Sequence, residues 1–596
     1  MNTRALPPVR GLLCVAVVGT VYFPLPGLAQ DVIPDDTLGA ESSIVTPLDA
    51  NTDRIDGGAL RDAVLFHSFE GFSIPQGHEV YFANPELVNT IFSRVTGDDP
   101  SRLFGTLGVL GEADLLFLNP NGVLFGPNAE LDLQGAFTVT TGTGVVFPGG
   151  EVFSAVEPGA VPLLTVDVQP QVGVVFEGET PAAIVNQGNL TVDSGQSLVL
   201  VGGALANSGT LYAPGGQVSV AAAPGNHEVQ FEPTGTVQSW SALAGEPLAY
   251  EGLSIEALVN SSGLDLATLP AEPSVFEPGT TVVSGRIDAS SDVSEGGAIQ
   301  VLGDRVALVD AIVEASGAVG GGEVFIGGDY QGQGVLPTAS RTFIGSEVLI
   351  TADALQEGNG GRVIVWADGN TEFLGNITVR GGAITGDGGF VEVSGSEDLR
   401  FLGNVNTQAI NGDGGTVLLD PRDITIVNGS GGNNDGELAD AIIFASDSPD
   451  NDFTISEEAL EFLSTQTNNI LLRARRNITI ENLSDNELTI ARNPGANLTF
   501  EANFDPSQSG SFSMDVSDRI AAQQWNVNIL GDEVSIGTIG VSAFAFPNQI
   551  ENAGSITINA LDDIKVLGAT NIAADPNRHL QQTNYAANSI EKHLFS

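Results

Sequence analysis

The side chains that could carry out chemistry are few and scattered along this chain. The sequence contains no Gly-x-Ser-x-Gly nucleophile elbow, no His-Glu-x-x-His metal motif, no phosphate-binding loop and no dinucleotide fingerprint. Its five histidines are far apart: His67, His78, His227, His579 and His593. His67 lies in the run LFHSF and is predicted to be a packed strand residue rather than a ligand or a base. We therefore expect no histidine-based active site.

Acidic residues offer only weak candidates for a cation or a catalytic group. Asp98 and Asp99 follow Gly97 in a predicted loop that could hold a cation, but a solvated turn explains them better. Calcium-binding nonapeptides read Gly-Gly-x-Gly-x-Asp, whereas Asp387 and Asp413 precede their glycine pairs. A polysaccharide lyase would need carboxylates acting through calcium beside a basic residue, for which the candidates are Asp420, Arg422 and Asp423. We predict that the chain is not an enzyme and has no cofactor or metal site.

The stretch NPNGVLFGPNAELDL, residues 119–133, contains turn chemistry that organises the elements around it. Asn-Pro and Asn-Gly steps favour tight turns, because Pro fixes φ while Asn and Gly accept left-handed backbone. The apolar run Ala113–Leu118 precedes the first turn. Val123–Phe125 and Leu131–Leu133 are too short for helices and are predicted to be strands. Short strands that alternate with tight turns every few residues indicate a coiled β architecture.

A repeated unit fills the middle of the chain: a Gly-Gly pair followed by five or six alternating apolar and small residues. The pairs begin at positions 296, 321, 360, 388 and 414, so the steps are 25, 39, 28 and 26 residues. We interpret the glycines as turns that pass through positive φ. One such strand cannot bury its apolar face alone, but stacked coils can. The repeat therefore predicts an all-β chain folded as a right-handed parallel β-helix.

The spacing also predicts details of that helix. The 39-residue step indicates an insertion at Asp329–Arg341, and Asp387 and Asp413 should occupy equivalent corners of neighbouring coils. Later runs such as RNITI and SITI read as further strands, whereas Ser456–Leu463 is predicted to be a short helix with a Ser N-cap. At one coil per 25 residues the mature chain would hold about 22 coils, a rod on the order of 100 Å. Residues 576–596 do not continue this repeat of glycine turns and short strands.

Four ordered blocks resemble the secretion domain of filamentous-haemagglutinin-like exoproteins, the passengers of two-partner secretion. They are GGALRDAVLFHSFEGF (57–72), VYFANPELVNTIFSRVTG (80–97), LFGTLGVLG (103–111) and the NPNG stretch that begins at residue 119. The later runs DYQGQG, DGGFVEVSG and LLDPRDI resemble the repeat region of cyanobacterial-type members. Many members carry a second motif, Asn-Pro-Asn-Leu, where this chain has Asn84-Pro85-Glu86-Leu87.

This resemblance implies a route of export and a site. A partner outer-membrane β-barrel transporter would recognise the secretion domain, and the chain would cross unfolded and fold outside as an adhesin or surface protein. The resemblance places the secretion signature at Asn119, Pro120, Asn121 and Gly122. A tight corner that only lets the first coils form explains these residues equally well. The expected location is secreted or cell-surface, reached through the periplasm and the outer membrane.

Residues 1–29 have the pattern of a secretory signal peptide. Arg4 and Arg10 precede or flank an apolar stretch at 11–23, and a small-x-small sequence ends at Ala29, so cleavage is expected before Gln30. Thirteen apolar residues are too few to span a bilayer, which takes about 20, and no later run is long enough. The only cysteine, Cys14, lies in this signal, so the mature chain would have none.

The charge balance excludes two classes of partner. With 74 acidic and 21 basic residues the net charge is −53, which argues against nucleic acid and against anionic lipid. Charged residues make up only 16% and apolar residues 42%, so the chain is not a disordered acidic tail. The acidity fits a solvated, self-repelling surface. Binding of calcium or of a cationic glycan is the alternative, and a glycan or cell-surface ligand is a possible partner.

Together the patterns and the resemblance divide the chain into five segments. They are the signal peptide (1–29), a secretion domain that caps the helix (30–270), the Gly-Gly repeat β-helix (271–425), further coils with a short helix (426–575) and an irregular polar tail (576–596). The expected function is that of a secreted adhesin. One rival is a β-helical polysaccharide-acting enzyme. The other is a contact-dependent toxin, which would need an effector domain where residues after Leu418 still read as strands.

Overall fold

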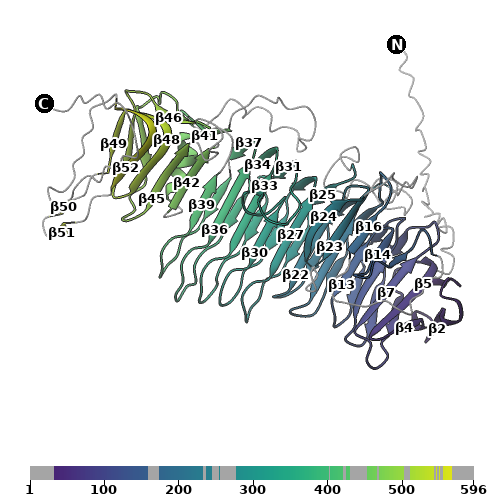
Figure 1. Ribbon diagram of the computed structural model, residues 1–596. Helices are drawn as coiled ribbons and strands as arrows, with labels where there is room; N and C mark the ends of the chain where they lie inside the picture. Colours follow the sequence, from purple (N-terminus) through teal and green to yellow (C-terminus); the bar gives the residue numbers. More distant parts are fainter. Residues whose placement is uncertain are drawn as a thin grey trace, which may run out of the picture.

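Short strands stacked in register build the chain into an elongated three-walled prism (Figure 1). This computed structural model describes residues 32–158, 173–231, 236–243, 254, 277–401, 403–419, 424–429, 453–465, 469–474, 476–502, 510–541, 545–546, 549–550 and 555–566. The expected signal peptide with its cleavage site at Ala29 and Gln30 lies outside these residues, as does the expected tail at 576–596. The candidate cluster Asp420, Arg422 and Asp423 also lies outside them.

Each coil gives one strand to each of three walls, which the chain visits in a fixed order. The first wall is a parallel stack of β5 (Val64–Phe72), β7 (Thr90–Val95), β10 (Asp114–Leu118), β13 (Phe137–Thr140), β19 (Ser197–Gly202), β22 (Gln217–Ala222), β27 (Ala298–Gly303), β30 (Glu323–Ile326), β33 (Arg362–Ala367), β36 (Phe390–Gly395), β39 (Thr416–Leu419), β42 (Asn469–Ala474), β45 (Asn497–Ala502), β48 (Asn526–Ile536) and β52 (Ile556–Val566).

The other two walls follow the same stacking. The second wall holds β8 (Ser101–Leu103), β11 (Val123–Phe125), β17 (Ala183–Asn186), β20 (Ala204–Asn207), β25 (Thr280–Val283), β28 (Arg305–Leu308), β31 (Arg341–Ile344), β34 (Asn370–Phe373) and β37 (Asp398–Phe401). The third wall holds β3 (Thr52–Gly57), β6 (Glu79–Ala83), β9 (Thr106–Leu110), β12 (Glu130–Asp132), β18 (Asn189–Thr191), β21 (Thr210–Tyr212), β26 (Arg286–Asp288), β29 (Ile312–Glu314), β32 (Leu349–Thr351), β35 (Asn376–Thr378) and β38 (Asn404–Asn406).

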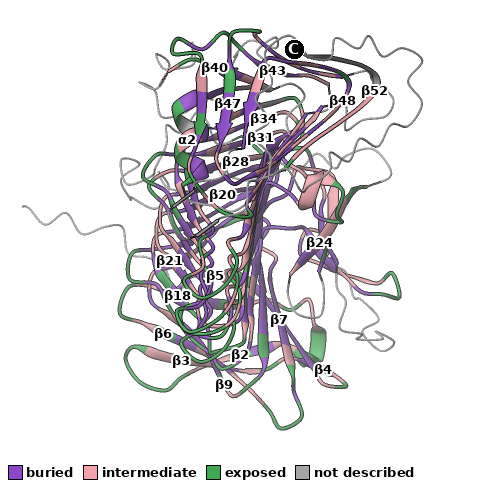
Figure 2. Ribbon diagram, turned by 90° about the vertical axis from the view of Figure 1, so that its left-hand side faces the viewer, coloured by how far each residue is buried: buried purple, intermediate pink, exposed green. Residues whose placement is uncertain are grey.

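The parallel β-helix predicted from the repeat is confirmed. The first-wall register joins Ala298 to Glu323, then to Arg362, Phe390 and Thr416, which reproduces the steps of 25, 39, 28 and 26 residues. Alternate residues of the three walls point inward and form one continuous apolar core along the prism. Figure 2 shows this distribution: the strands are largely buried, and exposed residues gather in the loops at the edges.

The 39-residue step contains the expected insertion. After β30 the chain leaves the coil, forms the short 3-10 turn η4 (Tyr330–Gly332) and returns at β31. The insertion packs over the first wall, because a Cβ placed on Gly332 would lie 2.7 Å from the Trp366 ring. Trp366 is buried although it points out of the coil, and it donates a hydrogen bond to Asp368 Oδ1 at 3.1 Å.

The glycine pairs have a different role from the one that the sequence suggested. None of the pairs at 296, 321, 360, 388 and 414 has φ in the left-handed range. They form necks where backbones of neighbouring coils nearly touch. A Cβ on Gly388 would lie 1.7 Å from the Thr407 carbonyl oxygen, and a Cβ on Gly389 2.1 Å from the Gly361 oxygen. The expectation of positive φ was wrong: these glycines are needed because no side-chain atom fits between the chains.

Antiparallel strands close the N-terminal end of the prism. β1 (Val32–Pro34) and β4 (Ala59–Arg61) pair antiparallel with β5, and β2 (Ser43–Pro47) pairs antiparallel with β3. The turn η1 (Gly39–Glu41) lies between β1 and β2. These strands cap the first coil, which would otherwise present an open edge.

A separate antiparallel sheet covers the outside of the first wall in the N-terminal half. We call it the covering sheet; it consists of β14 (Gly144–Val146), β15 (Val152–Ser154), β16 (Gly173–Phe176), β23 (His227–Phe231) and β24 (Val237–Ala242). Phe147 and Phe153 pack on Phe66 and Phe92 of the first wall, and Val174 and Val229 pack on Val199 and Val201. Strands of that wall are therefore buried on both faces, and β19 contains only buried residues.

The C-terminal coils continue the stacking of parallel strands. Their remaining elements are β40 (Ile424–Val427), β41 (Phe453–Ser456), α2 (Glu457–Ser464), β43 (Ile478–Ile480), β44 (Glu487–Ile490), β46 (Ser511–Met514), β47 (Arg519–Ala522), β49 (Thr538–Gly540), β50 (Ala545–Phe546) and β51 (Gln549–Ile550). Here β40 pairs with both β41 and β43, and β50 and β51 form a separate antiparallel pair. The helix α2 is the one expected at 456–463, and it contacts β38 and β44 at the third-wall position.

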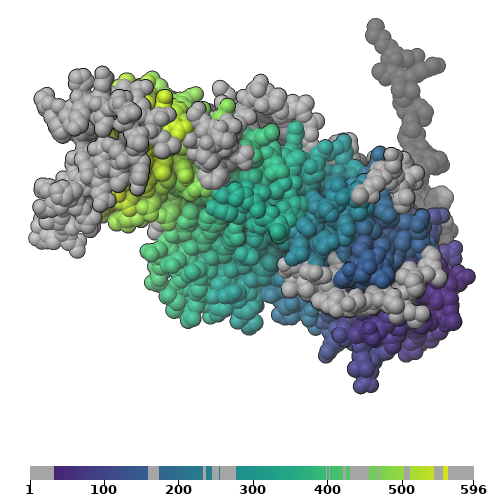
Figure 3. All heavy atoms as spheres, in the orientation of Figure 1, coloured from purple at the N-terminus to yellow at the C-terminus, as the bar shows by residue number. Residues whose placement is uncertain are grey.

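The described residues contribute fifteen strands to the first wall. The fifteen first-wall strands of the described residues would span about 70 Å at ~4.8 Å per coil. These fifteen strands compare with about 22 coils expected for the mature chain. Within the described residues, the covering sheet and the insertion at 327–340 use residues outside the coil. Figure 3 shows the elongated body, with the sequence running from one end to the other.

Candidate functional site at the corner 119–122

The segment Asn119–Gly122 turns the chain from β10 in the first wall to β11 in the second. Asn119 Oδ1 accepts a hydrogen bond from the Asn121 N–H at 2.9 Å, and the Asn119 carbonyl accepts one from the Gly122 N–H at 3.2 Å. Gly122 has φ +115°, which an L-residue adopts only with strain. The Asn side chain, the fixed φ of Pro120 and the freedom of Gly122 together build this turn, as the sequence predicts.

The two asparagine amides tie the corner to the preceding coil. Asn119 Nδ2 donates to the Asp99 carbonyl at 3.0 Å and to Ser101 Oγ at 2.9 Å. Asn121 Nδ2 donates to the Gly97 carbonyl at 2.6 Å. The backbone reaches the next coil as well, because the Asn119 N–H donates to the Thr140 carbonyl at 3.0 Å. The corner therefore connects three successive coils.

Burial decides what this corner can do in the folded protein. Asn119 has 0% of its surface exposed, Pro120 and Gly122 are buried, and only Asn121 is half-buried. A partner protein has no access to the Asn119 amide once the coils have formed. Removing one partner of a buried hydrogen bond typically costs ~1–3 kcal/mol. None of the four corner residues is titratable, and their hydrogen bonds join one coil to the next.

The segment Asn84–Leu87 makes a related corner between β6 and β7. Asn84 Nδ2 donates to the Val88 carbonyl at 2.9 Å, and Asn84 Oδ1 accepts from the Ala113 N–H of the next coil at 3.1 Å. Glu86, which stands where many secretion domains have Asn, is exposed. Leu87 is 82% exposed and has φ +78°. The substitution at Glu86 therefore replaces no buried contact of this chain.

The acidic and histidine candidates lie apart from one another. Asp98 and Asp99 are exposed in the loop held by the two asparagine amides. Within the described residues no three His, Cys, Asp or Glu side chains gather as a metal site. His67 is fully buried in β5, with Nδ1 3.0 Å from Ser43 Oγ. Burial lowers the pKa of His67 to about 4, against an opposing effect of the Asp56 charge, so the ring is neutral at physiological pH.

Sequence reasoning missed a buried ionic network that joins the cap to the covering sheet. Arg94 is 1% exposed; it donates to Ser68 Oγ at 3.0 Å and to the Ser154 carbonyl at 2.6 Å, and its guanidinium lies 4.2 Å from the Phe153 ring centroid. Burial lowers the pKa of Arg94 to about 10, while the charge of Asp35 opposes that shift. The guanidinium is therefore charged at neutral pH.

Asp35 is the acidic partner in this network. Burial would raise the pKa of Asp35, but hydrogen bonds from Thr96, Ser68 and Thr37 outweigh it and hold the pKa below its usual range. The residues that meet here are far apart in the sequence and share no motif. No local signal could have revealed the network.

A pair of stacked asparagines was also missed, although it leaves a signal. Asn186 and Asn207 end β17 and β20 and are fully buried, and Asn186 Nδ2 donates to Asn207 Oδ1 at 2.8 Å. Asn186 Oδ1 also accepts from the Gly188 N–H at 3.0 Å. The repeated pattern Asn-x-Gly before a short strand, in NQGNL and NSGTL, marks both positions. These residues hold coils together in the same manner as Asn119.

Fold and site together define a repeat-built β-helical protein whose distinctive buried polar groups join one coil to the next. Comparison with known proteins adds the family of the N-terminal part. Residues 30–244 match the family model of the TPS secretion domain. The N-terminal part of the chain, residues 30–244, is therefore similar to TPS secretion domains.

Individual relatives match more locally. The heme/hemopexin-binding protein of Haemophilus influenzae (strain ATCC 51907 / DSM 11121 / KW20 / Rd) is 37% identical over 86 residues, which are 14% of this chain and 9% of that protein. The crystal structure of the HMW1 secretion domain from Haemophilus influenzae aligns at 24% identity and TM-score 0.35, covering 64% of this chain and 99% of that one. The filamentous hemagglutinin secretion domain aligns at 16% identity and TM-score 0.25, covering 65% and 100%. The fold is established by this chain's own strand pairing.

No helix among the described residues is long and apolar enough to cross a membrane.

Proposed function

We propose that this chain is an adhesin or another extracellular surface protein, exported through a partner outer-membrane β-barrel transporter that recognises its secretion domain. The match of residues 30–244 to the TPS secretion domain carries the proposal. Coils from residue 277 onward extend the helix past that domain and present ordered loops along one edge. Binding residues concentrate on loops positioned by a rigid scaffold, so this layout suits attachment to a surface.

The ligand is proposed only as a class. The name of the heme/hemopexin-binding protein states what that protein binds, but the match to this chain spans only 9% of that relative's length. A protein or glycan of a cell surface remains the proposed ligand here. We also propose that the chain has no catalytic activity, which release of uronic acids from polysaccharide by the purified protein would contradict.

The composition supports export in the unfolded state. Cys14 is the only cysteine and lies in the expected signal peptide, so no disulfide can form in the periplasm and block a narrow pore. A net charge of −53 keeps an unfolded chain soluble by self-repulsion. Coils contact mainly their neighbours, so folding can begin at the first coils to emerge and spread along the helix.

For the corner at Asn119–Gly122 we propose a structural role in forming the first coils. Burial of Asn119 supports this role, because a transporter could contact that side chain only before folding. Bonds from the corner to the coils on either side support it too. Such a corner would make folding outside the cell prompt, and prompt folding would draw the rest of the chain through the pore.

The test compares corner variants with matched distal controls. Asn119→Ala and Gly122→Val remove the buried amide and strain the turn. Asn404→Ala removes an exposed amide, and Gly495→Val places a side chain at φ +85° with no atom within 4 Å. We expect both corner variants to lower the ratio of extracellular to periplasmic protein and to slow refolding from urea, whereas both controls behave like the native chain.

Two outcomes would overturn this role. If export falls while refolding is unchanged, the transporter reads the corner in the unfolded chain and the structural role is wrong. If export and refolding both match the controls, the corner is an ordinary turn.

A further inference from the structure

Five consecutive loops along one edge of the prism each expose an aliphatic side chain. The loops connect the third wall to the first at 290–295, 316–320, 353–359, 380–387 and 408–413. Their exposed residues form what we call the apolar ridge: Val293 (83% exposed), Val319 (46%), Leu355 (47%), Ile384 (61%) and Ile410 (77%). Isolated exposed aliphatic residues are ordinary, but a recurrence in every successive loop marks an interaction surface.

The ridge is rigid because the loops are bonded to one another. The Ala318 N–H donates to the Ser291 carbonyl at 2.9 Å, and the Leu355 N–H donates to the Gly317 carbonyl at 2.8 Å. Further along, the Ile384 N–H donates to the Gln356 carbonyl at 2.8 Å. The tips therefore keep the coil spacing of ~4.8 Å. An ordered row loses little conformational entropy when a partner binds.

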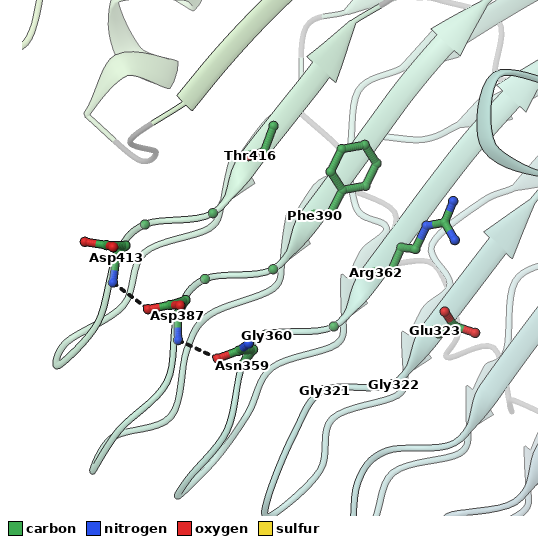
Figure 4. Close-up of a pocket in the computed structure, with 15 residues that line it drawn as sticks. Gly321, Gly322, Glu323, Asn359, Gly360, Arg362, Asp387, Phe390, Asp413 and Thr416 are labelled. Atoms are coloured by element: carbon green, nitrogen blue, oxygen red, sulfur yellow. Dashed lines mark hydrogen bonds between the residues drawn. The ribbon is translucent and has the colours of Figure 1, made fainter. Parts of the chain in front are cut away.

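A shallow groove of about 510 Å³ runs beside the ridge, across the glycine necks. Figure 4 shows its two sides: the first side chains of β33, β36 and β39 stand on one, and Asn359, Asp387 and Asp413 form a row on the other. The Asp413 N–H donates to Asp387 Oδ1 at 2.8 Å, and the Asp387 N–H donates to Asn359 Oδ1 at 2.8 Å. Ile384 lies only three positions before Asp387, so ridge and groove belong to the same loops.

The charge of this surface is strongly one-sided. The five loops contain one basic residue, Arg380, which Asp353 binds through Nε at 3.0 Å and Nη2 at 2.6 Å. The acidic residues of the loops apart from Asp353 are Asp292, Glu295, Glu357, Asp387 and Asp413. In the groove wall, Arg362 lies 5.4 Å from the Tyr330 ring centroid and 4.0 Å from an oxygen of Asp329. A ligand of this surface must therefore combine apolar and cationic groups.

We propose that the ridge and groove bind a basic amphipathic helix of a partner protein, laid parallel to the prism axis. A helix repeats its exposed face every 5.4 Å, close to the ~4.8 Å between loop tips, so one apolar residue per turn can meet one tip over several coils. An extended strand returns to the same face only every ~6.8 Å and soon loses register. Lysine or arginine residues flanking the apolar face would reach the carboxylates of the groove.

The charge balance excludes two other occupants. A second copy of the chain would bring another −53 charges to the contact. An anionic lipid surface is repelled by the same carboxylates. A cationic glycan could use the groove but gains nothing from aliphatic tips, and it is a competing outcome of the test.

This inference deepens the proposed adhesin role, and its test uses purified mature chain, so a negative result leaves the export experiment untouched. The probes are an 18-residue Leu/Lys amphipathic helix, the same residues scrambled, a Leu/Glu helix of the same pattern, and chitosan oligomers. Binding is followed by fluorescence anisotropy at two salt concentrations. We expect the Leu/Lys helix to bind at least about tenfold more tightly than its scrambled form, which corresponds to ~1.4 kcal/mol, and the Leu/Glu helix not to bind.

Paired variants locate the contact. Ile384→Asn with Ile410→Asn should weaken binding of the Leu/Lys helix about tenfold, whereas Val335→Asn, at an aliphatic residue 70% exposed outside the ridge, should not. Asp387→Asn with Asp413→Asn keeps the backbone hydrogen bonds and should reduce the salt dependence, whereas Glu347→Gln should not. Melting temperatures confirm that each variant is folded.

Three results would overturn the proposal. They are equal affinity for the helix and its scrambled form, insensitivity to the paired ridge variant, and tighter ridge-independent binding of chitosan than of the peptide.

Discussion

The N-terminal coils and the glycine-pair coils build the same corner in opposite ways. Between the third and first walls, the N-terminal coils use tight turns, as where the Gln196 N–H donates to the Asp193 carbonyl at 3.1 Å. Ser197 pairs with Gln217, a step of 20 residues. Past residue 296 the same corner opens into a loop, and Arg362 pairs with Phe390, a step of 28. The added residues form the ridge and do not enter the core.

The outer face of the first wall is also covered differently in the two regions. In the N-terminal coils the covering sheet buries it under Phe147, Phe153 and Val174. In β33 and β36 of the later coils the outward residues are buried except the first residue of each strand, Arg362 and Phe390, which are half-exposed beside the groove. The later coils therefore present side chains to solvent at this corner and in the loops. This contrast is consistent with the two proposals above, in which folding starts in the first region and a partner binds along the second.

The largest expected effect tests this division with two matched phenylalanines. Phe117 and Phe373 are both 0% exposed and each contacts another ring, Phe72 at 4.9 Å and Phe401 at 5.3 Å between centroids. Replacing either with Ala should lower the free energy of unfolding of its coils by ~3–5 kcal/mol. Only Phe117→Ala should sharply reduce the ratio of extracellular to periplasmic protein. Equal export of the two variants would remove the distinction between the regions.

The second effect is a dependence of stability on pH that arises at His67 in the N-terminal region. Burial lowers the pKa of His67 from 6.5 to about 4, so below pH 6.5 the unfolded chain binds a proton that the folded chain does not. Stability is lost as the pH falls from about 6.5 to 4, by on the order of 3 kcal/mol. His67→Gln should flatten this fall in urea midpoints measured with an N-terminal probe. If the urea midpoints of the native chain and of His67→Gln fall in parallel with pH, this role of His67 is contradicted.

The smallest effect distinguishes two reasons why a position requires glycine: lack of space for a Cβ atom and a positive φ. A Cβ on Gly388 would meet the Thr407 oxygen at 1.7 Å, whereas Gly495 has φ +85° and open space around its Cα. Gly388→Ala should therefore cost about 3 kcal/mol through forced separation of the coils. Gly495→Ala should cost about 1 kcal/mol through backbone strain alone. Thermal melts of both variants show which one loses more stability. A larger loss of stability for Gly495→Ala would mean that positive φ, and not lack of space, is the dominant constraint on these glycines.

The repeat was predictable because each of its signals lies within a short stretch of the sequence. Alternation in AIQVLG and RVIVWA fixes which side chains face inward, and the spacing of glycine pairs fixes the register of Ala298, Glu323 and Arg362. The corner at Asn119–Gly122 was predictable for the same reason, since Asn, Pro and Gly each constrain their own backbone. The burial of Asn119, Pro120 and Gly122 could not be read from four residues, because the loop at 97–101, to which the corner is bonded, belongs to the preceding coil.

The covering sheet and the ionic network escaped prediction for a different reason. Strands such as β16 and β23 have the same apolar alternation as coil strands, and nothing local shows that they pair antiparallel outside the prism. Arg94 reaches Thr37 and Ser154, and lies within the influence of the Asp35 charge, only because the cap and the covering sheet converge on β7. The purpose of the glycine pairs was misjudged because the approach of the Thr407 carbonyl to Gly388 depends on a chain one coil away.

The glycine necks also bear on how such a protein can diversify. Each neck closes its loop with a hydrogen bond between fixed coil positions, from the Gly322 N–H to the Ala315 carbonyl and from the Gly389 N–H to the Val379 carbonyl, both at 2.7 Å. These partners are 7 positions apart in the first case and 10 in the second, yet the wall registers on either side are unbroken. Doubling the length of a flexible loop costs only ~0.6 kcal/mol in closure entropy. Descendants of this chain could therefore lengthen, shorten or exchange tip sequences one loop at a time, and change what they attach to while inheriting the same scaffold.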